Sequence, residues 1–284
     1  MSHPTSPAPN ALIYRATPSI LADADKLAWK TAYLSGLIAP ETAACLSVLL
    51  KEKTSRSTSD QSLNTPQQES IDFFRTLSES NLDRRHRVTA VLLRHYYLLS
   101  ASRYNPKISA LKDTWHNFEL LELHPNLWSL EAGLSRKEKS YLSFRSKNKI
   151  ELNQQCSSSI FQFIEFMLET CLEEAEHITR AFTRRNLRTT VQNIFTNNER
   201  LHNEGVKPST APALLNLLIQ GSLPYSEFDK FTGLSAQGAR AECLLLLKLG
   251  IISESPSKPG WIVPALPSWF AHHILPALNG HTKN

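Results

Sequence analysis

Apolar residues recur with helical spacing through the segment from Ser158 to Arg185. The stripe consists of Ile160, Phe163, Ile164, Met167, Leu168 and Cys171. Because residues three and four apart share one face of an α-helix, this segment predicts a long helix with one side in a core. The shorter run from Val88 to Tyr97 is apolar on almost every face, which predicts a buried central helix. A mostly α-helical fold is therefore expected.

Further helical patterns span 20–37, 40–51, 84–97, 108–121, 137–144 and 188–202. Residues 1–18 are rich in Ser and Pro and predict a disordered lead-in, whereas residues 53–70 are rich in Ser, Thr and Gln and predict a polar loop or linker. Residues 19–203 are thus expected to form one helical domain.

The pattern changes after Gly205. Helices are expected at 211–220, 225–231 and 235–249, the last with Ser235 as its N-cap and Gly250 as its stop. A short hairpin is expected to follow, with strands at 251–252 and 261–263. Three helices followed by a hairpin predict a small winged helix-turn-helix domain over residues 204–284.

A winged helix either reads DNA or serves as a protein-contact module. The residues expected to face DNA are Ser235, Gln237 and Arg240 on the third helix, together with Lys258 in the wing. Glu242 is expected to be exposed as well. A single arginine beside a glutamate can make few contacts to phosphates and base edges. A structural or partner-docking role is therefore favoured, and DNA binding remains the alternative.

The composition is that of a soluble globular protein, with 41% hydrophobic and 20% charged residues among 284. The sequence contains no apolar run of the roughly 18 residues that a membrane span needs, and its first residues lack a signal-peptide core. The cysteines are scattered without metal-ligand spacing, which predicts reduced thiols, no metal site and a cytoplasmic location. The net charge of +5 indicates anionic partners only if it gathers on one face.

One basic cluster lies at 180–188. Arg180, Arg184 and Arg188 are spaced by four and share a helix face, with Arg185 turned away from it. The acidic residues Glu173, Glu174 and Glu176 lie just upstream. A solvated helix surface whose charges pair with one another is therefore the favoured interpretation.

Three blocks along the chain resemble, in order and spacing, a group of bacterial Fic proteins with a C-terminal winged helix. The first runs from His95 to Arg103 and corresponds to the family signature H-P-F-x-[D/E]-G-N-G-R-x-x-R. The second is Leu127-Trp128-Ser129 followed by Gly133-Leu134-Ser135-Arg136 and Tyr141. The third is the Phe166–Glu173 run. The resemblance covers residues 70–278 and implies a Fic-like helical bundle.

Fic enzymes transfer AMP from ATP to a target hydroxyl. The resemblance implies that His95 stands at the position of the general base and Arg103 at that of a phosphate clamp. The run Ser100-Ala101-Ser102 replaces the glycine-rich anion loop, Leu99 replaces the acidic residue that holds magnesium, and Pro106 replaces the second arginine. Losing a metal ligand and a phosphate loop removes electrostatic terms of a few kcal/mol each.

The sequence therefore favours a degenerate Fic-family protein that lacks efficient AMP transfer and acts by binding or regulation, with a protein partner. One alternative is a residual or altered nucleotidyltransferase acting on protein hydroxyls through His95 and Arg103, and ATP and magnesium would be its cofactors. Another is a winged-helix DNA-binding regulator. No other cofactor and no membrane partner are expected.

Overall fold

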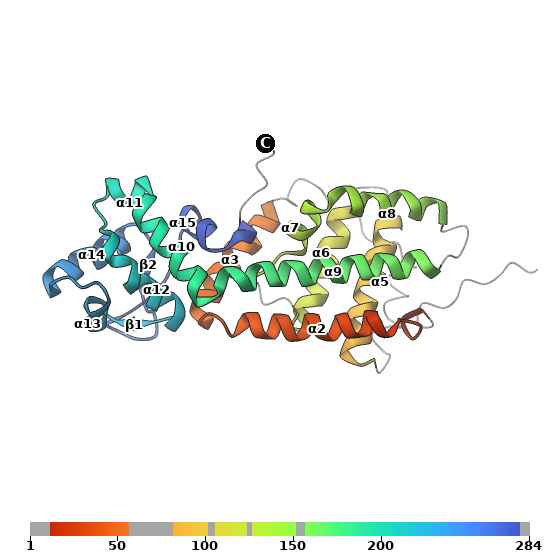
Figure 1. The fold of residues 1–284 in the computed structure, drawn as a ribbon, viewed down its shortest axis with the longest axis horizontal. Helices are drawn as coiled ribbons and strands as arrows, with labels where there is room; N and C mark the ends of the chain where they lie inside the picture. The colour runs from red at the N-terminus through yellow and green to blue at the C-terminus, as the bar shows by residue number, and fades with distance from the viewer. Residues whose placement is uncertain (1–11, 57–81, 102–105, 124–126, 152–156, 279–284) are drawn as a thin grey trace, which may run out of the picture. The chain divides into compact units, whose positions relative to one another are not determined.

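The structure is a computed structural model that describes residues 12–56, 82–101, 106–123, 127–151 and 157–278. It is mostly helical (Figure 1). Before the C-terminal elements the helices are α2 (Pro18–Ser35), α3 (Pro40–Arg56), α5 (Arg84–Ala101), α6 (Pro106–Leu120), α7 (Leu130–Arg136), α8 (Glu138–Glu151) and α9 (Ser157–Phe182). The helical pattern noted in the sequence at 84–97 is confirmed and extends four residues further. The short α7 was not anticipated, and Ser129 caps it by accepting a hydrogen bond from the backbone N–H of Ala132.

The C-terminal elements combine helices with one small sheet. They are α10 (Arg184–Asn197), α11 (Glu199–Asn203), η1 (Pro208–Thr210), α12 (Ala211–Gln220), β1 (Leu223–Pro224), α13 (Tyr225–Phe228), η2 (Asp229–Phe231), α14 (Ala236–Lys248), β2 (Ile252–Glu254), β3 (Trp261–Pro264), α15 (Ser268–Ile274) and η3 (Pro276–Leu278). The sheet is antiparallel in the order β1-β3-β2. The expected hairpin is present as β2 and β3, and β1 adds a third strand that the sequence did not indicate.

The chain forms two compact units. Unit 1 takes in Met1–Thr31, Thr58–His124 and Ser129–Ala175, and unit 2 takes in Ala32–Ser57, Pro125–Trp128 and Glu176–Asn284. The division therefore differs from the expected segments 19–203 and 204–284.

Hydrogen bonds within unit 2 explain why α3 belongs to it. The hydroxyl of Thr42 donates to the carbonyl of Leu218 (2.8 Å), and the ammonium of Lys53 donates to the carbonyl of Ala277 (2.8 Å). These bonds join parts of the chain that are distant in sequence, and helical periodicity carries no information about such pairings.

Unit 1 is built around a core in which α5 and α6 pack side by side (Figure 1). The predicted stripe on α9 is confirmed, because Phe163, Met167 and Leu168 are fully buried. Ile160, at the start of the stripe, is only half-buried. The central run of α5 is buried as expected, with Val88 and Leu92 inaccessible to solvent.

In unit 2 the N-cap and the stop that the sequence predicts are confirmed at the two ends of α14. The Ser235 hydroxyl accepts a hydrogen bond from the backbone N–H of Gly238, as an N-cap does. Gly250 ends the helix with φ +69°, a left-handed conformation that glycine adopts without steric cost. Among the described residues no single helix is long and apolar enough to cross a membrane. Of the described helices, only α2 and α3 together reach that length and apolar composition, and the chain bends sharply between them.

Candidate functional site

His95 lies inside the core of unit 1, although the resemblance places it at the position of the general base. Its side chain is fully buried on α5, and both ring nitrogens are engaged. Nδ1 lies 2.7 Å from the hydroxyl oxygen of Thr114 on α6, and Nε2 lies 2.8 Å from the hydroxyl oxygen of Tyr141 on α8. The ring of Phe163 on α9 packs against the imidazole. Four helices thus meet at this one side chain.

The hydrogen bonds around His95 assign its tautomer. The Thr114 hydroxyl donates to the backbone carbonyl of Ala110 (2.8 Å), so its oxygen must accept from His95. Nδ1 therefore carries the proton, and Nε2 accepts from the hydroxyl of Tyr141. The hydrogen bonds run in one direction, from Tyr141 through His95 and Thr114 to Ala110.

Burial also holds the imidazole neutral. Removal from water lowers the pKa of His95 from its ordinary value of 6.5 to about 3. A general base must reach the proton that it removes, directly or through one water. The only lone pair of this tautomer is already used by Tyr141, and the ring is inaccessible to solvent. His95 therefore acts as a packing and hydrogen-bonding residue in this conformation.

The backbone after His95 does not form an anion loop. Helix α5 continues through Ser100 and Ala101, so their N–H groups point back along the helix toward the carbonyls of the preceding turn. These two N–H groups are therefore used within the helix, and the nucleotide-binding role that the resemblance implies for Ser100 and Ala101 stays a prediction. Leu99 is buried. Ser102 and Arg103 lie outside the described residues, and Pro106 is the first residue of α6.

The other two sequence blocks meet each other in unit 1. A Cβ atom on Gly133 of α7 would lie 2.9 Å from Cγ2 of Thr170 on α9, so only glycine permits this approach without a shift. Arg136, at the end of α7, forms an ion pair with Glu174, whose side chain is fully buried. The other carboxylate oxygen of Glu174 has no hydrogen-bond partner within the described residues. The blocks are therefore joined by close packing and one buried charge.

Two of the four residues expected to face DNA in unit 2 make contacts within the protein itself. Ser235 caps α14. The ammonium of Lys258 lies 4.7 Å from the centre of the Trp261 ring. Gln237 and Arg240 are exposed on α14. Gln237 and Arg240 are three residues apart on α14 and are therefore neighbours on its surface. That the four residues face DNA stays a prediction.

Glu242 was expected to be exposed, and this is wrong. Its side chain is buried, with one carboxylate oxygen accepting from the backbone N–H of Lys207 and from the hydroxyl of Thr210, both at 3.0 Å. Because a buried carboxylate is costly unless it is hydrogen-bonded, these two bonds explain its position. The carboxylate fastens α14 to the segment that leads into α12.

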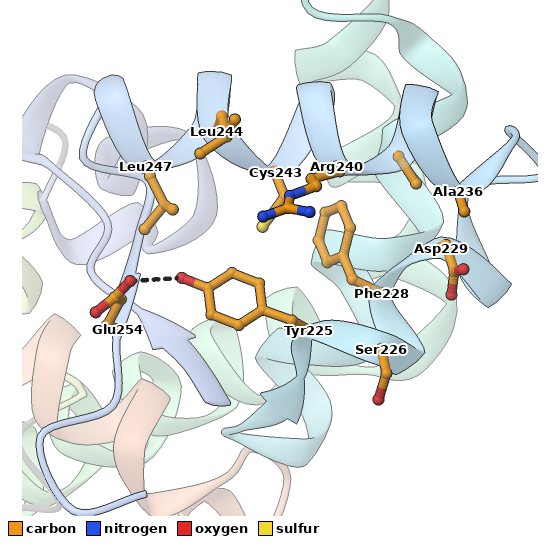
Figure 2. Close-up of a pocket in the computed structure, with 11 residues that line it drawn as sticks. Tyr225, Ser226, Phe228, Asp229, Ala236, Arg240, Cys243, Leu244, Leu247 and Glu254 are labelled. Atoms are coloured by element: carbon orange, nitrogen blue, oxygen red, sulfur yellow. Dashed lines mark hydrogen bonds between the residues drawn. The ribbon is translucent and has the colours of Figure 1, made fainter. Parts of the chain in front are cut away.

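Arg240 lines a pocket of about 480 Å³ between α13, α14 and β2. Figure 2 shows its guanidinium among Tyr225, Phe228 and Cys243, with Leu244 and Leu247 above. The hydroxyl of Tyr225 donates to a carboxylate oxygen of Glu254 (3.0 Å) at one end. The pocket therefore has an apolar lining and charged groups at its edge.

Neither Cys243 nor Tyr225 is an activated nucleophile in this pocket. Burial raises the pKa of the Cys243 thiol to about 11, so the thiol stays protonated near neutral pH. Burial and the hydrogen bond to Glu254 raise the pKa of Tyr225 to about 12. Sequence reasoning missed this pocket, because it depends on how α13 and α14 pack and leaves no periodic signal.

The predicted pairing of the 180–188 arginines with the upstream acidic residues is confirmed for Arg180. Among the described residues it is not found for Arg184, Arg185 or Arg188. Glu173 pairs with Lys137 at 2.8 Å, and Glu174 pairs with Arg136. Glu176 pairs with Arg180 at 3.1 Å. The acidic residues upstream are thus paired with cations other than the arginines of α10.

Comparisons with protein-family models, with curated proteins and with solved structures gave no match. Within the described part of the chain, no group of three or more His, Cys, Asp or Glu side chains is placed to hold a metal ion. Cys45, Cys171 and Cys243 are free thiols.

Proposed function

We propose that this chain is a Fic-like protein that acts by binding and does not transfer AMP efficiently. The state of His95 carries the proposal: the residue at the position of the family's base is buried, neutral and hydrogen-bonded at both nitrogens. The Fic resemblance is supported by contacts between its three blocks. His95 bonds to Tyr141, and Gly133 packs on Thr170.

The rate contribution of a base, compared with that of the lost metal ligand and anion loop, favours loss of catalysis. A base contributes about 10²- to 10⁴-fold to a rate, and only when it reaches the reacting proton. The metal ligand and anion loop that would supply the larger electrostatic stabilisation are replaced by Leu99 and by a helical backbone at Ser100 and Ala101. The remaining candidate, Arg103, would act alone on the phosphates.

We further propose that unit 2 contains a winged helix that contacts a partner protein. The order α12, β1, α13, α14, β2, β3 and the sheet order β1-β3-β2 support the winged-helix assignment. The pocket beside α14 favours protein over DNA, because Leu244 is 59% exposed and the lining is apolar. Arg240 at its edge complements a carboxylate. The partner segment is therefore expected to present apolar side chains next to an acidic residue.

AMP transfer tests the main proposal. The full-length protein is incubated with labelled ATP, magnesium and a cell extract as the source of target proteins. We expect no label on any protein beyond a protein-free control. Label that is lost in His95→Gln but retained in His202→Gln, a change at an exposed histidine, would overturn the proposal. Circular dichroism of both variants shows whether they are folded.

The pocket is tested by selecting binders from a random-peptide library on the full-length protein. The selected peptides are expected to carry apolar residues beside Asp or Glu. They should bind Leu120→Asp, a matched change at a leucine that is 69% exposed in unit 1, but not Leu244→Asp. Equal binding to both variants would place the contact elsewhere and contradict the assignment.

A further inference from the structure

Helix α10 presents a cluster of arginines that no part of the proposed function uses. Arg184, Arg185 and Arg188 are all exposed. Arg188 follows the other two by four and three residues, so it neighbours both on the helix surface. Arg185 was expected to be turned away from Arg184 and Arg188, and this is wrong. At about 100° per residue, Arg185 lies about 60° from Arg188, and the three side chains fall within about 100° of the helix circumference. We call this surface the arginine face of α10.

Among the described residues, the arginine face has no ion-pair partner. The sequence contains no Asp or Glu between Glu176 and Glu199. Helices α12 and α15 and the turn η1, which pack against α10, contain none either. Helix α11 also packs against α10, and its Glu199 follows the C-terminal end of α10, opposite to the arginines. Within the described residues none of the three arginines forms an ion pair. Positive charge therefore accumulates on this part of α10 without an ion pair from the described residues.

The position of these arginines is unfavourable for helix stability. Arg184 and Arg185 occupy the first turn of α10, where a cation opposes the helix dipole at a cost of about 0.3–1 kcal/mol. Glu or Asp is the stabilising choice at such positions. A chain selected only for the stability of α10 would not place two arginines there, so an external anion is the simplest reason for them.

The rest of the solvent face indicates which anion. The other exposed residues of α10 are Asn186, Thr189, Gln192, Asn193, Thr196 and Asn197. All of them are neutral side chains that can donate hydrogen bonds, and none is apolar. A helix that lies in a membrane surface carries Trp, Phe or Leu for insertion, and protein hot spots are rich in aromatic residues. Arginines among small hydrogen-bond donors are instead typical of contacts to nucleic-acid phosphates.

We propose that the arginine face of α10 binds the phosphate backbone of nucleic acid. The guanidinium groups of Arg184, Arg185 and Arg188 each make charge-assisted hydrogen bonds to phosphate oxygens, and the amide of Gln192 adds a neutral one. Such contacts position a nucleic acid without reading its bases. These arginines lie on a different element of unit 2 from Ser235, Gln237 and Lys258, and the inference does not depend on whether AMP transfer is absent.

The test is the salt dependence of binding to a labelled DNA duplex of mixed sequence, measured by fluorescence anisotropy with the full-length protein. Each phosphate contact contributes about 0.9 to the slope of log K against log salt. The triple variant Arg184→Gln, Arg185→Gln, Arg188→Gln should therefore have a slope shallower by about 2.7. Between about 50 and 200 mM salt, wild-type affinity should fall about 40-fold more than that of the variant.

A matched control removes the same amount of charge elsewhere. Lys107, Lys230 and Lys248 are surface lysines that pair with Glu138, Glu227 and Glu204. Replacing all three lysines by glutamine should leave the slope near that of the wild type. The proposal is overturned if the slope of the lysine control becomes as shallow as that of the arginine variant, or if the arginine variant has the wild-type slope. It is also overturned if the wild-type protein binds anionic vesicles but no duplex. Single-stranded RNA as a second probe shows which nucleic acid is preferred.

Discussion

Acidification should destabilise the protein through His95. The native imidazole has a pKa of about 3, whereas in the unfolded chain the pKa returns to 6.5. Between these values the unfolded state binds a proton that the native state does not, so stability is full above the unfolded pKa and falls as the pH drops below it. Each pH unit is worth about 1.4 kcal/mol. At about pH 5 the loss from this one residue is therefore about 2 kcal/mol.

The measurement compares wild type with His95→Gln. Glutamine does not titrate, so the free energy of unfolding of the variant lacks the pH-dependent contribution of His95. Urea unfolding followed by far-UV circular dichroism should show the variant to be less stable near pH 7, with the gap narrowing by about 2 kcal/mol by about pH 5. His202→Gln, at an exposed histidine, should keep the wild-type pH dependence.

A gap that stays constant with pH would refute this account, because it would mean that the native imidazole takes up a proton as readily as the unfolded one. A second measurement needs no variant. In an NMR titration of the folded wild type, the His95 ring signals should not shift down to about pH 4. Titration near the ordinary pKa would contradict the buried, neutral assignment directly.

Three further changes test the packing of unit 1. Tyr141→Phe leaves a buried imidazole nitrogen without its donor and should cost about 1–3 kcal/mol in the free energy of unfolding. Arg136→Met should cost about 3–5 kcal/mol, because it leaves the carboxylate of Glu174 buried and unpaired, and Arg136→Lys should recover part of the loss. Gly133→Ala should destabilise by about 1–3 kcal/mol although alanine favours helices, and Thr170→Ser, which removes the opposing methyl group, should relieve it. Urea unfolding measures all three, and an unchanged midpoint would contradict the contact concerned.

The helices were predictable where the signal was local. The periodic stripe on α9, the cap at Ser235 and the stop at Gly250 are set by residues within a few positions of one another, and all three are confirmed. The charged residues were not predictable in the same way. Glu242 lies on α14 among exposed positions, and its burial depends on Lys207 and Thr210, which precede it by 35 and 32 residues.

The candidate site shows the same limit. His95 was singled out by its sequence neighbours, but its chemistry is set by Thr114 and Tyr141 on other helices. Likewise, the pairing of Glu173 and Glu174 with residues around α7 could not be read from helical spacing, because those partners lie more than thirty residues upstream. Local patterns indicate elements, whereas the state of a buried polar group depends on tertiary contacts.

The one-directional run of hydrogen bonds from Tyr141 to Ala110 has a consequence for observing how unit 1 opens. The proton on Nδ1 of His95 is enclosed by α5, α6, α8 and α9, so it reaches solvent only when those helices separate. Its exchange with deuterium should therefore be as slow as that of the best-protected backbone amides. A downfield imidazole resonance would then report, from inside the core, the free energy of opening of this helical unit.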